Sequence, residues 1–222
     1  MSFIFTFLFV VMVIISAFMQ AEDNHWKNII SPALTAFCGL LILIGALISN
    51  VPFAQGITLF IALILLAASD FMFERSVTNE NLFPIAMVLG VISGFTIGIL
   101  FNVIAFSRGA PWWIQGVFVG IGIVAAVFVY RYLEVDPVLN IAVYIYLVQA
   151  VILLAGGLSS LYVGNIFFAI WGVFIFLSDS LVGLRAFPSQ KRPLPRLIEK
   201  RILFSIIVLY YAAQYALVAW AL

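Results

Sequence analysis

The sequence predicts an all-α protein, a polytopic bundle that crosses a membrane with about eight helices. Of the 222 residues, 66% are hydrophobic and only 9% are charged, and the mean hydropathy is +1.26. A soluble domain of this length carries charge on roughly a quarter of its residues. The apolar runs are continuous rather than alternating with a period of two, so they are not barrel strands. The bilayer is therefore the expected solvent.

Eight segments meet or approach the roughly 20 apolar residues that a spanning helix needs. In chain order they are Phe3–Met19, Ile29–Ile48, Gly56–Phe73, Phe83–Phe106, Ile114–Leu133, Val138–Gly157, Val163–Phe187 and Leu197–Leu222. The first lacks the charged start and the cleavage site of a signal peptide, so we expect a helix of the mature protein. Short connections with turn residues, such as Ser49–Pro52, Arg108–Pro111 and Glu134–Pro137, separate the segments. Residues 1–222 are thus expected to form a single transmembrane domain.

Basic residues gather on one side of the predicted membrane. With eight spans, the connections 1–2, 3–4, 5–6 and 7–8 and their flanks hold nine of the ten Lys and Arg residues, and Arg108 lies on the other side. The positive-inside rule predicts that this basic side is cytoplasmic and that both termini lie opposite. The basic cluster Gln190–Arg196 is interpreted either as a topology anchor or as an attractor of anionic headgroups.

Composition also excludes several kinds of chemistry. A net charge of +1 does not supply the concentrated basic face that a nucleic-acid partner would need. The single cysteine, Cys38, excludes an intramolecular disulfide and a cysteine-based metal cluster. The single histidine, His25, lies in the polar stretch Ala21–Asn28, which excludes a histidine cluster. We therefore expect neither a metal nor an organic cofactor.

Two acidic residues stand inside apolar segments, Asp70 in the third and Asp179 in the seventh. An acid near the bilayer centre costs roughly 2.5–3.5 kcal/mol, and less toward the interface, so such residues commonly have a function. Asp70 precedes Arg75 by five residues and Asp179 precedes Arg185 by six, which places each about 7–9 Å inside the boundary. Both segments run in the same direction, so the two acids could face one cavity at one depth.

Other interpretations of the two acids remain open. Each could cap or hydrogen-bond a neighbouring helix, or lie near enough to the interface to stay hydrated. Both could instead form a proton relay in a transporter, a class that usually shows broken helices at matching places in two halves. The separation of 109 residues, near half the chain, suggests a parallel duplication, although the repeats share only the dipeptides Ser69-Asp70 and Ser178-Asp179.

Further polar side chains are expected in the same region: Thr35, Asn140, Tyr144, Tyr210, Tyr211 and Gln214. Any one of them is more often an interhelical hydrogen bond or an interface anchor than a catalytic group. The small residues Gly116, Gly120 and Gly122 are expected to let the fifth segment pack closely against a neighbour.

Two motifs resemble those of a known family. The stretch Trp171–Phe187, with its core Ser-Asp-Ser-Leu, resembles the signature of the YhhN, or lysoplasmalogenase-like, membrane family. The stretch Tyr210–Gln214 resembles the Tyr-Tyr-x-x-Gln of that family's last helix, and Asp70 stands where the family has its first acid. Helix number and length fit across nearly the whole chain.

The resemblance implies a membrane hydrolase that cleaves the vinyl-ether bond of lysoplasmalogens to a fatty aldehyde and a glycerophospho-alcohol. It makes Asp70 and Asp179 the catalytic acids and a lysophospholipid or another amphipathic lipid the partner. The candidate substrate-binding residues are Ser69, Ser178, Asn140, Tyr144, Tyr211 and Gln214. The expected location is a bacterial inner membrane or a eukaryotic endomembrane, and the oligomeric state is left open.

Vinyl-ether cleavage suits a pair of carboxyl groups. Protonation of the β-carbon forms an oxocarbenium ion that water traps, so the site needs one carboxylic acid and one carboxylate, as in glycoside hydrolysis. The chain departs from the family pattern at three places. Ser69 stands where Gly is usual, and Ser31 precedes Pro32 where the family often has Lys before Pro. The run Gly94–Asn102 contains no His, although the family commonly has one on its fourth helix. These departures favour the alternative, a catalytically degenerate member that acts as a lipid-binding protein, transporter or membrane subunit.

Overall fold

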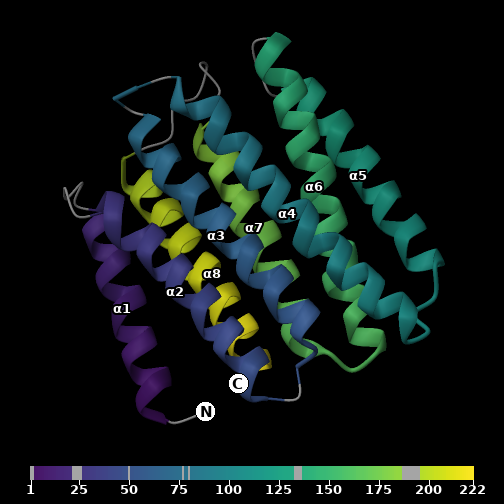
Figure 1. The fold of residues 1–222 in the computed structure, drawn as a ribbon. Helices are drawn as coiled ribbons and strands as arrows, with labels where there is room; N and C mark the ends of the chain where they lie inside the picture. The colour runs from purple at the N-terminus through teal and green to yellow at the C-terminus, as the bar shows by residue number, and fades with distance from the viewer. Residues whose placement is uncertain are drawn as a thin grey trace.

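The computed structural model describes residues 3–21, 27–49, 51–76, 78–79, 81–132, 137–186 and 196–222. These residues form eight helices and no strand (Figure 1). The helices are α1 (Phe3–Ala21), α2 (Lys27–Ile48), α3 (Phe53–Ser76), α4 (Leu82–Ser107), α5 (Trp113–Tyr132), α6 (Pro137–Tyr162), α7 (Ile166–Ala186) and α8 (Arg196–Ala221). The predicted all-helical fold is confirmed.

Five helices, α2, α3, α4, α6 and α8, are long and apolar enough to cross a membrane. The other three contain shorter apolar stretches, Phe9–Phe18, Trp113–Val124 and Ile166–Val182. The chain is thus a multi-pass helical membrane protein, and eight spans remain the prediction from the sequence.

Four helix ends differ from the predicted ones by three or more residues. Helix α3 runs from Phe53 to Ser76 rather than from Gly56 to Phe73, and α6 and α7 differ at one end each. Helix α6 was expected to end at Gly157 but continues to Tyr162, because Gly157 lies at a helix crossing rather than in a turn. Helix α7 begins at Ile166 instead of Val163, because Gly164 turns the chain with φ +80° and the Asn165 side chain accepts a hydrogen bond from the Phe168 amide at 3.3 Å. Residues 134–136 and 190–195 and His25, named in the sequence predictions, lie outside the described ranges.

Six of the helices form a closed ring. Helix α2 packs against α3, α3 against α4, α4 against α6, α6 against α7, α7 against α8, and α8 against α2. Helix α1 lies outside the ring against α8 and α2, and α5 lies outside it against α6 (Figure 1). Helices α3 and α7 therefore stand on opposite sides of the ring.

The two halves of the chain are arranged in the same way. Helices α2, α3 and α4 follow one another around half of the ring, and α6, α7 and α8 follow one another around the other half. The Ser69 hydroxyl on α3 donates to the Ala86 carbonyl on α4 at 2.7 Å, and the Ser178 hydroxyl on α7 donates to the Ile206 carbonyl on α8 at 3.2 Å. These matching contacts support the parallel duplication that the spacing of the acids suggested.

The described basic residues lie mainly at one end of the bundle. Both termini lie at one end in Figure 1, and the last turns of α1, α3, α5 and α7 and the first turns of α2, α4, α6 and α8 lie at the other. Arg75 stands in the last turn of α3, and Lys200 and Arg201 stand near the start of α8, so all three lie at the second end. Arg108, which follows α4, lies at the end that carries the termini. We call the second end the basic end; its assignment to the cytoplasm remains a prediction.

Small residues allow close helix crossings inside the ring. A Cβ atom on Gly157 of α6 would lie 2.9 Å from the Phe168 carbonyl oxygen and 3.0 Å from the Gly172 Cα atom of α7. The expectation for α5 is wrong for Gly116 and Gly120, because no atom of another helix in the described part of the chain lies within 4 Å of a Cβ built at either residue. Only Gly122 of the three meets a neighbour, Val151 of α6. Close approach therefore concentrates within the ring, whereas much of α5 faces outward.

We expect Gly157→Ala to destabilise the fold by about 1–3 kcal/mol, because the added methyl group overlaps the backbone of α7. Gly120→Ala is the matched control, since it adds the same methyl group where space is open and gains up to about 1 kcal/mol of helix propensity. Thermal unfolding of both variants in detergent measures the difference. Equal melting temperatures for the two variants would contradict the close crossing.

Candidate functional site

Asp70 is held by side chains from two other helices. The Tyr210 hydroxyl on α8 donates to the Asp70 Oδ2 atom at 2.7 Å, and the Thr35 hydroxyl on α2 reaches the same oxygen at 3.4 Å. The Thr35 and Tyr210 hydroxyls are themselves 3.1 Å apart. Thr35 also lies 3.3 Å from the Ser31 carbonyl in its own helix, where it can donate a hydrogen bond. This arrangement fixes one carboxyl oxygen of Asp70 at the meeting point of α2, α3 and α8.

Asp179 lies on α7, across the ring from α3. Its carboxyl accepts a hydrogen bond from the Tyr146 hydroxyl of α6 and interacts electrostatically with the Asp70 carboxyl. Tyr146 interacts electrostatically with both acids. Each carboxyl group is thus contacted by a tyrosine from another helix, and the charges of the two acids interact; a single cavity that both acids face stays a prediction.

Ser69 and Ser178, which precede the two acids, are turned toward neighbouring helices. Both are buried, and each hydroxyl donates to a carbonyl of the next helix. Successive helical residues point about 100° apart, so a serine fixed against the adjacent helix directs the following aspartate toward the ring interior. These contacts tie α3 to α4 and α7 to α8 beside the two acids; the predicted role of both serines in substrate binding stays a prediction.

Tyr211 lies beside the Asp70 cluster but bonds elsewhere. Its hydroxyl lies 2.7 Å from the Ser31 hydroxyl and donates to the Ser31 carbonyl at 3.0 Å, which ties α8 to α2. Its ring meets the Tyr210 ring edge-on at 5.2 Å. Tyr210, its neighbour in the chain, is the residue of this pair that contacts Asp70.

On α6 the contact to Asp179 comes from Tyr146, which the sequence analysis did not select. Tyr144 stands two residues earlier and therefore points about 200° away around the helix. Tyr146 shares its face with Gln149 and Leu153, which are 3% and 0% exposed. In the sequence, Gln149 follows Tyr146 by three residues, so the two polar side chains lie on one face of the helix. That spacing is the signal that could have identified Tyr146. Asn140, the other candidate on α6, is not among the residues whose side chains the structure describes.

Further polar atoms are buried deeper in the bundle. Gln214 is fully buried one turn beyond Tyr210, and neither atom of its amide has a described protein partner. The Gln149 Oε1 and Trp171 Nε1 atoms are also buried without one. Gln149 lies against Gly94 of α4, where any side chain would overlap its amide. Buried polar atoms are nearly always hydrogen-bonded, so these groups are available to water or to polar groups of a ligand.

Aromatic side chains fill the ring at the end opposite the acids. Phe101 of α4 stacks on Phe168 of α7 at 4.0 Å and meets Trp171 edge-on at 5.4 Å. Phe168 also contacts Trp220 of α8 at 4.7 Å. This aromatic cluster packs side chains of α4, α7 and α8 against one another between the acids and the end that carries the termini.

The described residues form no group of three or more His, Cys, Asp and Glu side chains that could hold a metal ion. The site contains the carboxyl groups of Asp70 and Asp179, which accept hydrogen bonds from the hydroxyls of Tyr210 and Tyr146. A pair of this kind can divide general-acid and general-base roles between its members.

One family model matches most of this chain. The model of the YhhN family matches residues 30–221, which include α3, α7 and both acids. Neither the curated proteins nor the solved structures give a significant match. Because the match covers most of the chain, the protein belongs to the YhhN family.

Proposed function

We propose that this protein is a membrane hydrolase that cleaves the vinyl-ether bond of lysoplasmalogens, releasing a fatty aldehyde and a glycerophospho-alcohol. The observation that carries the proposal is the pairing of Asp70 and Asp179 from opposite helices of the ring, close enough to interact electrostatically. The resemblance of the segment around Asp179 and of Tyr210–Gln214 to lysoplasmalogenase-like proteins supplies the substrate class.

The chemistry requires only protons and water. A vinyl ether carries its nucleophilic carbon two bonds from the oxygen, and a protonated carboxyl donates its proton to that carbon. The neighbouring carbon becomes part of an oxocarbenium ion, which the second carboxylate stabilises while it removes a proton from the attacking water. A hemiacetal results. This parallels glycosidases, where two carboxyls also flank an oxocarbenium-like transition state.

Collapse of the hemiacetal completes the cycle. The bond between the former vinyl carbon and the glycerol oxygen breaks, and the glycerol oxygen takes the proton that the second carboxyl received from water. The hemiacetal hydroxyl becomes the aldehyde carbonyl and returns its proton to the first carboxylate. The first carboxyl is then protonated and the second ionised, as at the start of the cycle. The pair acts as a unit, so the acid and base roles are not divided here between Asp70 and Asp179.

The depth of the site suits this substrate. Each acid lies about 7–9 Å inside the expected membrane boundary, counted at 1.5 Å per residue. In a lysoplasmalogen the vinyl ether joins the glycerol to the hydrocarbon chain, just below the headgroup. A substrate with its headgroup at the basic end therefore places the reacting bond near the two carboxyls.

A lipid carrier on the same scaffold is the competing proposal, motivated by the departures at Ser31, Ser69 and the His-free run on α4. The aromatic cluster of Phe101, Phe168 and Trp171 weighs against a pathway through the ring. Such a carrier would bind lysolipid without turnover, or move it across proteoliposomes.

The test is aldehyde release from a lysoplasmalogen by the purified protein. Two controls match the substrate closely: the saturated 1-O-alkyl lysolipid lacks the double bond, and the 1-acyl lysolipid replaces the ether with an ester. We expect turnover of the vinyl ether alone. In D₂O the aldehyde should gain one deuterium at carbon 2, and in H₂¹⁸O the released glycerol hydroxyl should carry no label. Absence of turnover, or equal turnover of the ester, would contradict the proposal.

A further inference from the structure

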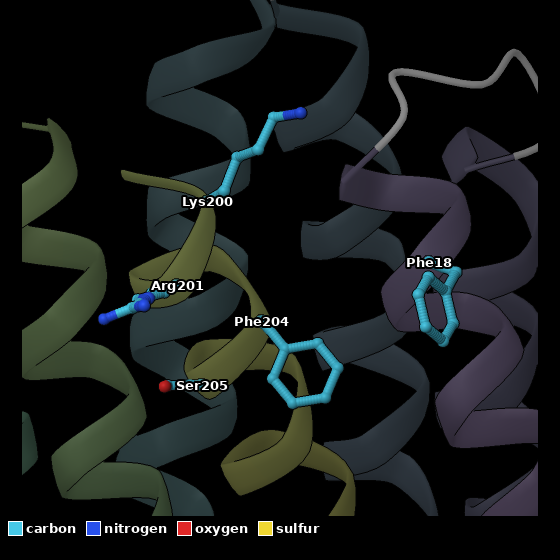
Figure 2. A pocket seen from close by; sticks show the side chains of 5 residues that line it. All are labelled: Phe18, Lys200, Arg201, Phe204 and Ser205. Atoms are coloured by element: carbon cyan, nitrogen blue, oxygen red, sulfur yellow. The ribbon is translucent and has the colours of Figure 1, made fainter. Parts of the chain in front are cut away.

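A pocket of about 390 Å³ opens on the outer surface of the bundle between α1 and α8. Its lining is Phe18 from α1 and Lys200, Arg201, Phe204 and Ser205 from α8. Figure 2 shows Phe18 and Phe204 on facing helices, with Lys200 extending away from the rings along α8. The pocket thus combines two aromatic rings, two cations and a hydroxyl.

The pocket lies near the membrane boundary. Phe18 stands three residues before the end of α1, and Lys200 stands four residues after the start of α8. Both positions belong to the basic end of the bundle. The Phe18 and Phe204 rings are 59% and 42% exposed, so they are available to hydrocarbon. Lys200 and Arg201 are exposed near the same boundary.

This pocket is distinct from the site of the two acids. Tyr210 points into the ring toward Asp70. Arg201 stands nine residues before Tyr210, which is about 180° around the helix, so it faces the opposite side of α8. In Figure 2, Phe204 is turned toward Phe18 of α1, whereas Arg201 and Ser205 lie on the side of α8 away from Phe18. The described side chains that bond to Asp70 are Tyr210 and Thr35, and neither lines the pocket.

The chemistry of the lining matches one class of molecule. Arginine and lysine are the side chains that recognise phosphate, by paired hydrogen bonds and by point charge. Aromatic rings just below them suit the upper part of an acyl chain, and basic residues near a membrane surface each add about 1 kcal/mol of attraction to anionic lipid. We propose that this pocket binds one anionic phospholipid of the surrounding membrane, its phosphate at Lys200 and Arg201 and its chain against Phe18 and Phe204.

Bound there, the lipid joins α1 to the ring. Helix α1 lies outside the ring, and a lipid that contacts both Phe18 and the basic residues of α8 adds to the interface between them. The occupied protein should therefore be more resistant to heat than the delipidated protein, by mass action.

The experiment measures thermal unfolding of delipidated protein in a neutral detergent with added phosphatidylglycerol, phosphatidylcholine or inorganic phosphate. We expect phosphatidylglycerol to raise Tm by about 2–4 °C or more, and the other two additions to raise it much less. The double variant Lys200→Gln/Arg201→Gln should lose at least half of the shift. Arg108→Gln, which removes an exposed cation at the other end of the bundle, should retain it.

Native mass spectrometry supplies a second measurement that does not depend on stability. The wild type should retain one phosphatidylglycerol that the double variant, and separately Phe204→Ala, retains in a smaller fraction of molecules. Equal retention and equal Tm shifts in wild type and double variant would overturn the proposal, as would equal effects of phosphatidylcholine. A shift with inorganic phosphate as large as that with phosphatidylglycerol would identify a phosphate site rather than a lipid site. These outcomes do not depend on hydrolytic activity.

Discussion

Asp70→Asn and Asp179→Asn are each expected to lower kcat for lysoplasmalogen hydrolysis by about 10²- to 10⁴-fold, the usual contribution of a general acid or base. An amide has nearly the shape of a carboxyl group but can neither deliver a proton to the vinyl carbon nor remove one from water. The contacts of Asp70 with Tyr210 and Thr35 go to one oxygen, which the amide can supply. Folding should therefore survive while the rate falls. Aldehyde release at saturating substrate gives kcat for each variant.

Glu74→Gln is the control for charge alone. Glu74 stands one turn after Asp70 on α3 and interacts with it electrostatically. Its removal changes the field at the site without removing a reacting carboxyl, so we expect a change of only a few fold. If Glu74→Gln lowered kcat as much as Asp70→Asn, the effect of Asp70 would be one of charge and not of proton transfer.

Tyr210→Phe is expected to lower kcat by about 10- to 100-fold, because it removes the shorter of the two described hydrogen bonds to Asp70. A hydrogen bond to a charged group is worth about 1.5–3 kcal/mol, and each 1.4 kcal/mol of barrier changes a rate about tenfold. Tyr210 acts through Asp70 and is a positioning residue. The loss should accordingly appear in kcat more than in KM.

Tyr211→Phe provides the matched comparison on the adjacent residue. It removes a hydroxyl of equal size that bonds to Ser31 and not to an acid. We expect a lower melting temperature, since a buried interhelical hydrogen bond is lost, and a kcat within a few fold of wild type. A reversed order, with Tyr211→Phe the slower enzyme, would show that the contact of Tyr210 with Asp70 does not orient the reacting group.

Hydropathy was sufficient to predict the helices because each must satisfy its backbone hydrogen bonds internally within the membrane. It could not predict where α6 ends. Gly156 and Gly157 resemble a helix terminus in the sequence, but a neighbouring backbone approaches each of them closely within the helix. Hydropathy and residue size also could not show that Gly116 and Gly120 do not meet a neighbouring helix, because a small residue permits close packing without requiring it. Whether a glycine meets a neighbour is decided by the rotation of its helix in the bundle.

The sequence identified the two acids because a charged residue in an apolar segment is energetically costly. It did not identify the tyrosines that bond to them. Tyr144 and Tyr146 are identical side chains two residues apart near the expected site, and only the rotation of α6 turns Tyr146 toward Asp179. Likewise, Tyr210 and Tyr211 are adjacent in one motif, and the packing of α8 against α2 divides their hydrogen bonds between Asp70 and Ser31. The ring of six helices, which sets these rotations, depends on contacts between distant segments.

The most direct test of the central claim, that Asp70 and Asp179 act together in one reaction, compares wild type, the two single Asn variants and Asp70→Asn/Asp179→Asn. Groups that act as a unit are strongly non-additive. We expect the double variant to hydrolyse lysoplasmalogen about as slowly as the slower single variant, with all four proteins folded and of similar melting temperature. Wild-type activity in either single variant, or a double variant whose loss is the full product of the two single losses, would contradict a shared catalytic pair.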